Sequence, residues 1–218
     1  MGYLMMGKAT MLGVVAAALF VCGSAEAATR ASCTKPRGYV VKTKTREAVI
    51  FTNRHGYRAY GCLFRQGDLV RLSGAVGQYR LAGRYAAYFL RYAEVGDITQ
   101  YRVMVRDLRT GGFRHIEAAY SDLPEQRPDD GYTAARVTNL TLKRNGSVAW
   151  LSCFPWDADV SHHCRAPQPD LEWEAWRADT RGRKLLDASD EVRVRSLRRD
   201  RSTLTWRHGD ETRTATLR

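Results

Sequence analysis

Short apolar runs alternate with polar turns along most of this chain, and one phrase of that pattern is repeated. Residues 142–150 show it best: an apolar residue, the polar turn Arg144-Asn145-Gly146, and a short apolar run that ends at Trp150. Asn and Gly favour tight turns, whereas short runs of β-branched, small and aromatic residues are typical of buried strands. The pattern predicts a hairpin whose second strand is buried.

The same phrase occurs four times, and each copy ends in an aromatic residue: Phe51, Tyr88, Trp150 and Trp206. A second phrase follows, in which a turn containing Gly separates two strands. It is clearest at residues 103–116 and 175–186. One repeat therefore corresponds to about four strands, which is the content of a propeller blade. Apolar positions follow no long helical period, so we expect a nearly all-β protein.

These phrases resemble the TolB-type β-propeller repeat, which is related to the WD-repeat propellers. In that repeat a turn such as Asp-Gly precedes a short strand ending in an aromatic residue, and an Asp-x-x-x-Gly turn precedes the last strand. Residues 144–150 and 107–111 match these two features. The resemblance covers residues 40–217 and implies a β-propeller-like fold of about four imperfect blades. A β-sandwich or an open β-repeat array is the alternative. The chain also resembles small uncharacterised secreted bacterial proteins, which implies no activity.

The fourth repeat is expected to lack its last strand, because it shows only three strand patterns, near residues 192–198, 202–207 and 211–217. An open sheet edge promotes aggregation. We therefore expect residues 38–42 to pair with residues 211–217 and to close a ring.

Residues 1–27 have the pattern of a cleaved signal peptide. A basic residue precedes an apolar run over residues 11–21, and residues 25–27 read Ala-Glu-Ala, a small-x-small cleavage pattern. The run is too short to cross a bilayer. We expect an exported protein, secreted or associated with the cell envelope, with a single β-repeat domain over residues 28–218 and no transmembrane segment in the mature chain. Acylation at Cys22 or an uncleaved anchor is the alternative.

Four cysteines remain after cleavage: Cys33, Cys62, Cys153 and Cys164. An even number of cysteines in an exported chain indicates disulfides. Of the three connectivities we favour Cys33–Cys62, which attaches the N-terminal segment to the first repeat, and Cys153–Cys164, which closes the loop after Trp150. Free buried thiols are the alternative.

The formal net charge is +12, and it is unevenly distributed. Residues 28–119 hold 17 basic and 6 acidic side chains, whereas residues 120–176 hold 5 basic and 9 acidic ones. A basic exported protein can associate with an anionic envelope polymer or with an acidic protein. An Arg-rich solvated surface without a partner is the alternative. Nucleic acid is not expected as a partner, because no reader motif is present.

The densest group of chemically versatile side chains follows the third aromatic residue. We interpret it as a candidate partner-binding loop closed by the second disulfide, with Trp156, Asp157, Asp159, His162 and His163. A metal site is not expected, because adjacent histidines on a strand point to opposite faces and the spacing of structural zinc ligands is absent.

No catalytic residue and no cofactor are expected. The sequence contains no nucleophile elbow, P-loop or dinucleotide fingerprint. It therefore favours a non-enzymatic exported protein for binding or scaffolding, or a binder of the envelope surface driven by charge. The rival hypothesis is a hydrolase whose site is assembled from distant residues in a propeller channel. Carboxylates or imidazoles that meet in such a channel would favour the enzyme.

Overall fold

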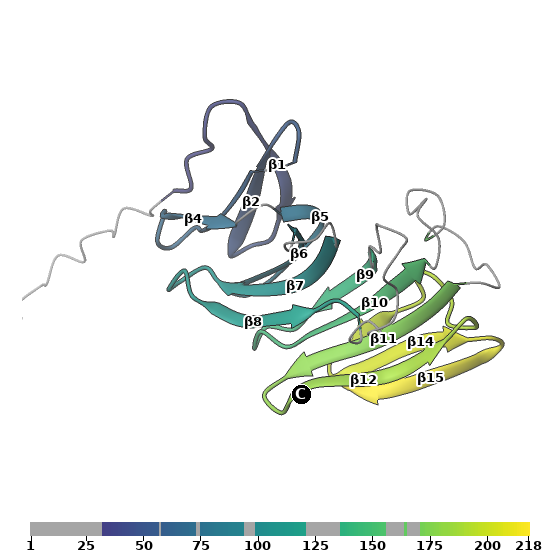
Figure 1. Cartoon of the computed structure of the whole chain (residues 1–218). Helices are drawn as coiled ribbons and strands as arrows, with labels where there is room; N and C mark the ends of the chain where they lie inside the picture. The colour runs from purple at the N-terminus through teal and green to yellow at the C-terminus, as the bar shows by residue number, and fades with distance from the viewer. Residues whose placement is uncertain are drawn as a thin grey trace, which may run out of the picture.

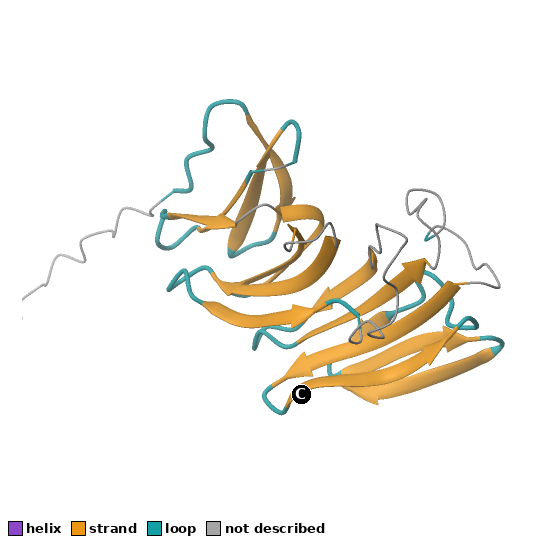
Figure 2. Cartoon of the chain, in the orientation of Figure 1, coloured by secondary structure: helices purple, strands orange, loops and turns teal. Residues whose placement is uncertain are grey.

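The computed structural model describes residues 32–56, 58–72, 75–93, 99–120, 136–155, 164 and 171–218. These residues form 15 strands and no helix, which confirms the all-β prediction (Figure 2). The strands belong to four antiparallel sheets, and within each sheet the strands that follow one another in the sequence pair with one another. Four repeats of about four strands were predicted, and four sheets are observed.

Sheets 1 and 2 hold the first eight strands. Sheet 1 contains β1 (Tyr39–Lys44), β2 (Ala48–Asn53), β3 (Ala59–Leu63) and β4 (Leu69–Leu72). Sheet 2 contains β5 (Ala75–Ala82), β6 (Tyr85–Ala93), β7 (Thr99–Asp107) and β8 (Phe113–Ala118).

Sheets 3 and 4 hold the remaining strands. Sheet 3 contains β9 (Arg136–Leu142), β10 (Val148–Pro155), β11 (Leu171–Asp179) and β12 (Gly182–Ser189). Sheet 4 contains only three, β13 (Arg198–Asp200), β14 (Thr203–His208) and β15 (Glu211–Thr216). The expectation that the fourth repeat has one strand fewer is confirmed within the described residues.

The four sheets are stacked in sequence order, from the purple sheet 1 to the yellow sheet 4 (Figure 1). Separate apolar cores fill the spaces between sheets 1 and 2, between sheets 2 and 3, and between sheets 3 and 4. The first strands of sheets 1, 2 and 3 converge, because β5 contacts both β1 and β9. We call the side of the stack formed by β1, β5 and β9 the inner edge.

The second strand of each sheet carries the aromatic residue that defines the repeat. Each aromatic side chain packs toward the preceding sheet: Tyr88 toward sheet 1, Trp150 toward sheet 2 and Trp206 toward sheet 3. The neighbouring positions on β6 and β10 pack toward the following sheet, because successive strand residues point to opposite faces. Second strands of interior sheets therefore present apolar residues to both neighbouring sheets.

Within the described residues no sheet precedes sheet 1, and the segment before β1 occupies that position. Phe51 is buried in a small outer cluster that includes Cys33 and Cys62, which are joined by a disulfide with a Cα–Cα distance of 5.9 Å. At the other end of the stack, the outer face of sheet 4 is polar, and Thr203, Thr214 and Thr216 are exposed. Polar outer faces are typical of the terminal repeats of stacked architectures.

The predicted pairing of residues 38–42 with residues 211–217 is wrong. Within the described residues β1 pairs with β2, β15 pairs with β14, and no closed propeller is formed. The two strands lie at opposite ends of the stack (Figure 1). The C-terminal segment instead joins sheet 3, where the Lys143 Nζ donates to the Leu217 carbonyl at 3.0 Å and Asp179 accepts from the Arg218 N–H at 3.3 Å.

Candidate functional site

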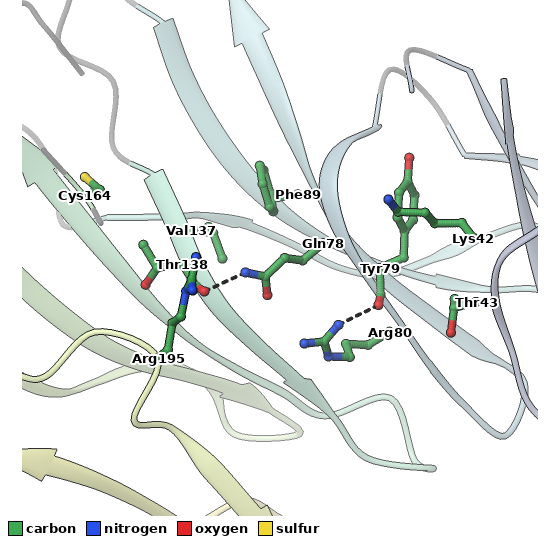
Figure 3. A pocket seen from close by; sticks show the side chains of 10 residues that line it. All are labelled: Lys42, Thr43, Gln78, Tyr79, Arg80, Phe89, Val137, Thr138, Cys164 and Arg195. Atoms are coloured by element: carbon green, nitrogen blue, oxygen red, sulfur yellow. Dashed lines mark hydrogen bonds between the residues drawn. The ribbon is translucent and has the colours of Figure 1, made fainter. Parts of the chain in front are cut away.

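A pocket of ≈ 590 Å³ lies at the inner edge, where the first strands of sheets 1, 2 and 3 converge (Figure 3). This volume is within the range of about 300–1,000 Å³ that is usual for small-molecule sites. Residues of β1, β5, β6 and β9 line the pocket, together with Arg195 from the loop before β13 and the disulfide-bonded Cys164. They are Lys42, Thr43, Gln78, Tyr79, Arg80, Phe89, Val137, Thr138, Cys164 and Arg195.

All three first strands are irregular where they meet the pocket. The β1–β2 ladder skips Lys42, and the β9–β10 ladder skips Thr138, so each is the extra residue of a bulge. The register of the β5–β6 ladder shifts between Ala75 and Tyr79, a stretch that contains Gln78. A bulge redirects side chains and is common beside functional sites. Three separate irregularities thus bring Lys42, Gln78 and Thr138 to one pocket.

Three exposed cations line this pocket: Lys42, Arg80 and Arg195. None of them forms an ion pair with a carboxylate of the described residues. The ten described residues that line the pocket include no Asp, Glu or His. Clustered cations without counter-charges create a positive potential that attracts anions.

Arg195 reaches the pocket from a loop held in an unusual conformation. Its φ is 56°, in the left-handed region that costs a residue with a side chain roughly 1–2 kcal/mol. The Arg198 guanidinium donates to the Arg195 carbonyl at 2.8 Å, and the Asn139 side chain donates from β9 to the Leu197 carbonyl at 3.1 Å. Such a conformation persists where its surroundings fix it, often beside a functional site.

The floor of the pocket is buried and largely apolar, and it contains Tyr79, Phe89 and Val137. Burial, with a smaller contribution from neighbouring Tyr88, raises the pKa of Tyr79 to about 12. The Tyr79 hydroxyl is therefore neutral at physiological pH and adds no negative charge. The Gln78 Nε2 donates to the Thr138 carbonyl at 2.6 Å, which ties β5 to β9 across the pocket.

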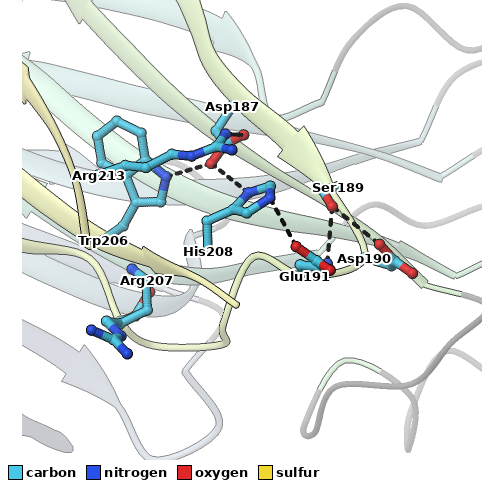
Figure 4. A network of polar contacts seen from close by, with 9 residues as sticks. Asp187, Ser189, Asp190, Glu191, Trp206, Arg207, His208 and Arg213 are labelled. Carbon is cyan, nitrogen blue, oxygen red and sulfur yellow. Dashed lines mark hydrogen bonds and ion pairs between the residues drawn. The ribbon is translucent and has the colours of Figure 1, made fainter. Parts of the chain in front are cut away.

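A second polar group lies between sheets 3 and 4 and joins β12 to β14 and β15 (Figure 4). The buried Asp187 carboxylate accepts from the Trp206 Nε1 at 2.6 Å and lies 3.1 Å from the His208 Nδ1. It also pairs with Arg213. The second ring nitrogen of His208, Nε2, lies 3.1 Å from a Glu191 carboxylate oxygen.

This second group resembles part of a catalytic triad but lacks its nucleophile. A triad needs a hydroxyl or thiol at the free imidazole nitrogen. In the described part of the chain that nitrogen of His208 faces Glu191, and the Ser189 hydroxyl bonds to Asp190 instead. We assign this cluster to the connection between the two sheets.

The structure joins the cysteines in the pairing that the sequence favoured. Cys153 and Cys164 form the second disulfide, and Cys164 lines the pocket. Two disulfides are typical of an oxidising, exported environment. The candidate partner-binding loop, with Trp156, Asp157, Asp159, His162 and His163, lies outside the described residues. The described ranges contain no group of three potential metal ligands and no helix able to span a membrane.

Sequence reasoning missed the pocket. Lys42, Arg80 and Arg195 lie far apart in the chain and belong to no motif. The excess of basic residues over residues 28–119 was the only sequence signal for a cationic site, and it does not say which cations converge. A bulge leaves no distinctive mark in the hydrophobic pattern, so its extra residue cannot be recognised before the ladders are known.

No protein-family model matches this sequence, and no curated protein matches it. Among solved structures, the fold is similar to Kuenenia stuttgartiensis hydrazine synthase, with a TM-score of 0.43 and 12% identity over 73% of this chain and 46% of that one. It is also similar to a chain in an S. cerevisiae complex of a Dbp5 variant with Nup159, a Gle1 variant, IP6 and ADP. There the TM-score is 0.37, with 11% identity over 84% of this chain and 50% of that one. This chain therefore spans about half of each.

Proposed function

We propose that this chain is an exported, non-enzymatic binding protein that holds an anionic ligand in the inner-edge pocket. Its four sheets would act as an open, propeller-like arc whose convergent first strands form the site. The convergence of β1, β5 and β9 supports this arrangement, because innermost strands line the central channel of a propeller. A signal-peptide pattern and two disulfides support export.

The observation that carries the proposal is the charge of the pocket. Three cations from different segments line it, and the described lining includes no carboxylate. Like charges that converge without partners are unfavourable in the free protein, and a bound anion removes that cost. The anionic ligand would be a small molecule or a segment of an envelope polymer.

The hydrolase alternative requires titratable groups that meet in the same place. Glycoside hydrolysis uses two carboxylates, and acyl transfer uses a nucleophile beside a base. The described residues of this pocket supply neither a carboxylate nor an imidazole. A binding role therefore fits the pocket better than a hydrolytic one.

The test compares short dextran sulfate with neutral dextran in calorimetric titrations of the mature protein. We expect dextran sulfate to bind and neutral dextran not to bind. The triple variant Lys42→Gln, Arg80→Gln, Arg195→Gln should weaken dextran sulfate binding at least about tenfold, because each lost cation removes a favourable contact and a released counterion. Affinity for the unaltered protein should fall as salt is raised.

A matched control removes three exposed cations elsewhere: Arg54→Gln, Arg109→Gln and Arg181→Gln. Both triple variants lose three positive charges, so a difference between them must come from the position of the charges. Only the pocket variant should lose most of the affinity for dextran sulfate. Equal losses in the two variants would overturn the proposal and favour a diffuse association driven by net charge.

A further inference from the structure

The proposed function leaves the chemical class of the anion open, and the pocket carries a second kind of group that bears on it. We infer, on the basis of that proposed function, that the ligand is an acidic oligosaccharide, a short chain of sugars that bears both carboxylates and hydroxyl groups. Gln78 and the threonines beside it supply the groups that would recognise the hydroxyl groups.

The Gln78 amide is fixed in one orientation. Its Nε2 donates to the Thr138 carbonyl at 2.6 Å, so Oε1 must be the other atom of the amide. Oε1 is shielded from solvent and accepts no hydrogen bond from the described residues. An unsatisfied buried acceptor is unfavourable, and a ligand O–H group would satisfy it after a small shift of the side chains that cover Oε1 in the free protein. An anion without hydrogen-bond donors cannot do so.

Two hydroxyl groups extend this polar side of the pocket. Thr43 follows the bulged Lys42 on β1, and Thr138 is the bulged residue of β9. The Thr138 hydroxyl donates to the Leu151 carbonyl at 3.4 Å, which leaves its oxygen as an acceptor. Lys42 and Thr43 are adjacent, so one segment of β1 offers both a cation and a hydroxyl group. This pair matches a sugar in which a carboxylate stands beside hydroxyl groups.

Other anions suit the pocket less well. A nucleotide base needs an accessible aromatic face for stacking, but Phe89 and Tyr79 are only 6% and 5% exposed. Polyphosphate brings charge but few donors for Gln78. An extended acidic peptide would need a regular strand edge to pair with, and all three first strands are bulged at the pocket.

The test uses four probes of matched size: trigalacturonate, its neutral methyl ester, tri-glutamate and tripolyphosphate. The ester keeps the hydroxyl groups without the charge, and tri-glutamate keeps the carboxylates without the hydroxyl groups. We expect trigalacturonate to bind the full mature protein at least about tenfold more tightly than each of the other three.

Two variants connect that preference to the pocket. Gln78→Met keeps the length of the side chain and removes the acceptor, and Thr43→Val keeps its shape and removes the hydroxyl. Each should weaken trigalacturonate about tenfold and leave tri-glutamate unchanged. Thr43 lies on the edge strand β1, so its variant keeps the test valid if Gln78→Met does not fold.

The outcomes separate the two proposals. Equal affinity for trigalacturonate, tri-glutamate and tripolyphosphate, still dependent on the three pocket cations, would overturn the saccharide and leave the anion site standing. Equal weakening of trigalacturonate and tri-glutamate by Gln78→Met would also overturn it. If no probe depends on the pocket cations, both proposals fail.

Discussion

The first and second strands of this repeat differ more from each other than one sheet differs from the next. The second strands are regular and buried; residues 148–153 of β10, for example, are all buried. The first strands β1, β5 and β9 carry the bulges and register shifts, and β1 and β5 carry the exposed cations Lys42 and Arg80. One repeat thus supplies packing with one strand and, in the function proposed above, recognition with its neighbour. Changes in second strands should mainly affect stability, and changes in first strands should mainly affect binding.

The largest effect is expected in a second strand. Trp150 is fully buried, stacks on Trp176 with ring centroids 6.2 Å apart, and donates from its Nε1 to the Ala119 carbonyl at 2.8 Å. Trp150→Ala should lower the free energy of unfolding by about 3–5 kcal/mol, as truncation of buried aromatic residues does. Denaturant unfolding measures this change.

Trp150→Phe is the milder comparison, because it keeps one aromatic ring and removes the five-membered ring together with its N–H donor. It should cost about 1–3 kcal/mol, since the Ala119 carbonyl loses its donor in a buried place. A loss below about 1 kcal/mol for Trp150→Ala would contradict the role assigned to the second strands.

The next largest effect concerns the second strand that has no preceding sheet. Phe51 of β2 is covered by the segment that the Cys33–Cys62 disulfide attaches. Replacing both cysteines with alanine should cost about 3 kcal/mol, by the loop-entropy argument for a loop of this length. Hydrogen exchange should accelerate in β2 and β3, whereas exchange in β14 should be unchanged. Equal acceleration in β14 would mean that the two ends of the stack are coupled.

A smaller effect on stability is expected where the C-terminal segment attaches to sheet 3, a place that belongs neither to the first strands nor to the second strands. Burial alone raises the pKa of Asp179, but the backbone N–H groups of Arg181 and Arg218 and the Arg177 charge outweigh it, so the pKa lies below its ordinary value. A carboxylate with a lowered folded pKa stabilises the fold above its unfolded pKa, near 3.9. That contribution is lost as pH falls through the lower folded value.

Asp179→Asn should therefore destabilise the protein by about 1 kcal/mol at pH 7, and the difference should shrink below about pH 4. Urea unfolding at several pH values measures it, with Asp210→Asn as the control, because Asp210 is a fully exposed partner of Arg193. A difference that stays constant down to pH 2 would show that Asp179 acts through its shape and not through its charge.

The smallest effect on stability is expected in the first strands. Lys42→Gln, Arg80→Gln and Arg195→Gln together should change the free energy of unfolding by less than about 0.5 kcal/mol, and the change should be toward greater stability. The reason is that three like charges at one pocket repel one another in the folded state, whereas three neutral amides do not. A loss above about 1 kcal/mol would show that these cations hold the fold, and the division between the strand classes would fail.

The parts of the fold that follow local rules could be predicted from the sequence. The four aromatic residues defined the repeat, and all four lie in the second strand of a sheet, although each strand continues beyond the aromatic residue at which the sequence pattern placed its end. Ring closure was predicted wrongly, because an open sheet edge indicates that it needs protection but does not indicate which segment provides it. The stack has two outer faces instead: the segment attached by the Cys33–Cys62 disulfide covers that of sheet 1, and threonines make that of sheet 4 polar.

The candidate site could not be predicted for a different physical reason. Its cations reach one pocket because the β1–β2 ladder skips Lys42, because β5 with Arg80 lies against both β1 and β9, and because the loop before β13 brings in Arg195. All three facts depend on pairing or packing between separate segments. The sequence pointed instead to the group around Trp156 and His162, where similar residues are close in the chain. That loop remains a prediction.

The most direct test is to map amide chemical shifts while trigalacturonate is added to the mature protein. The account predicts that the largest changes cluster at residues 42–43, 78–80, 137–138 and 195, with little change in the second strands. Changes spread over the basic surface, or concentrated outside these four segments while they stay fixed, would contradict the claim that the bulged first strands form the binding site.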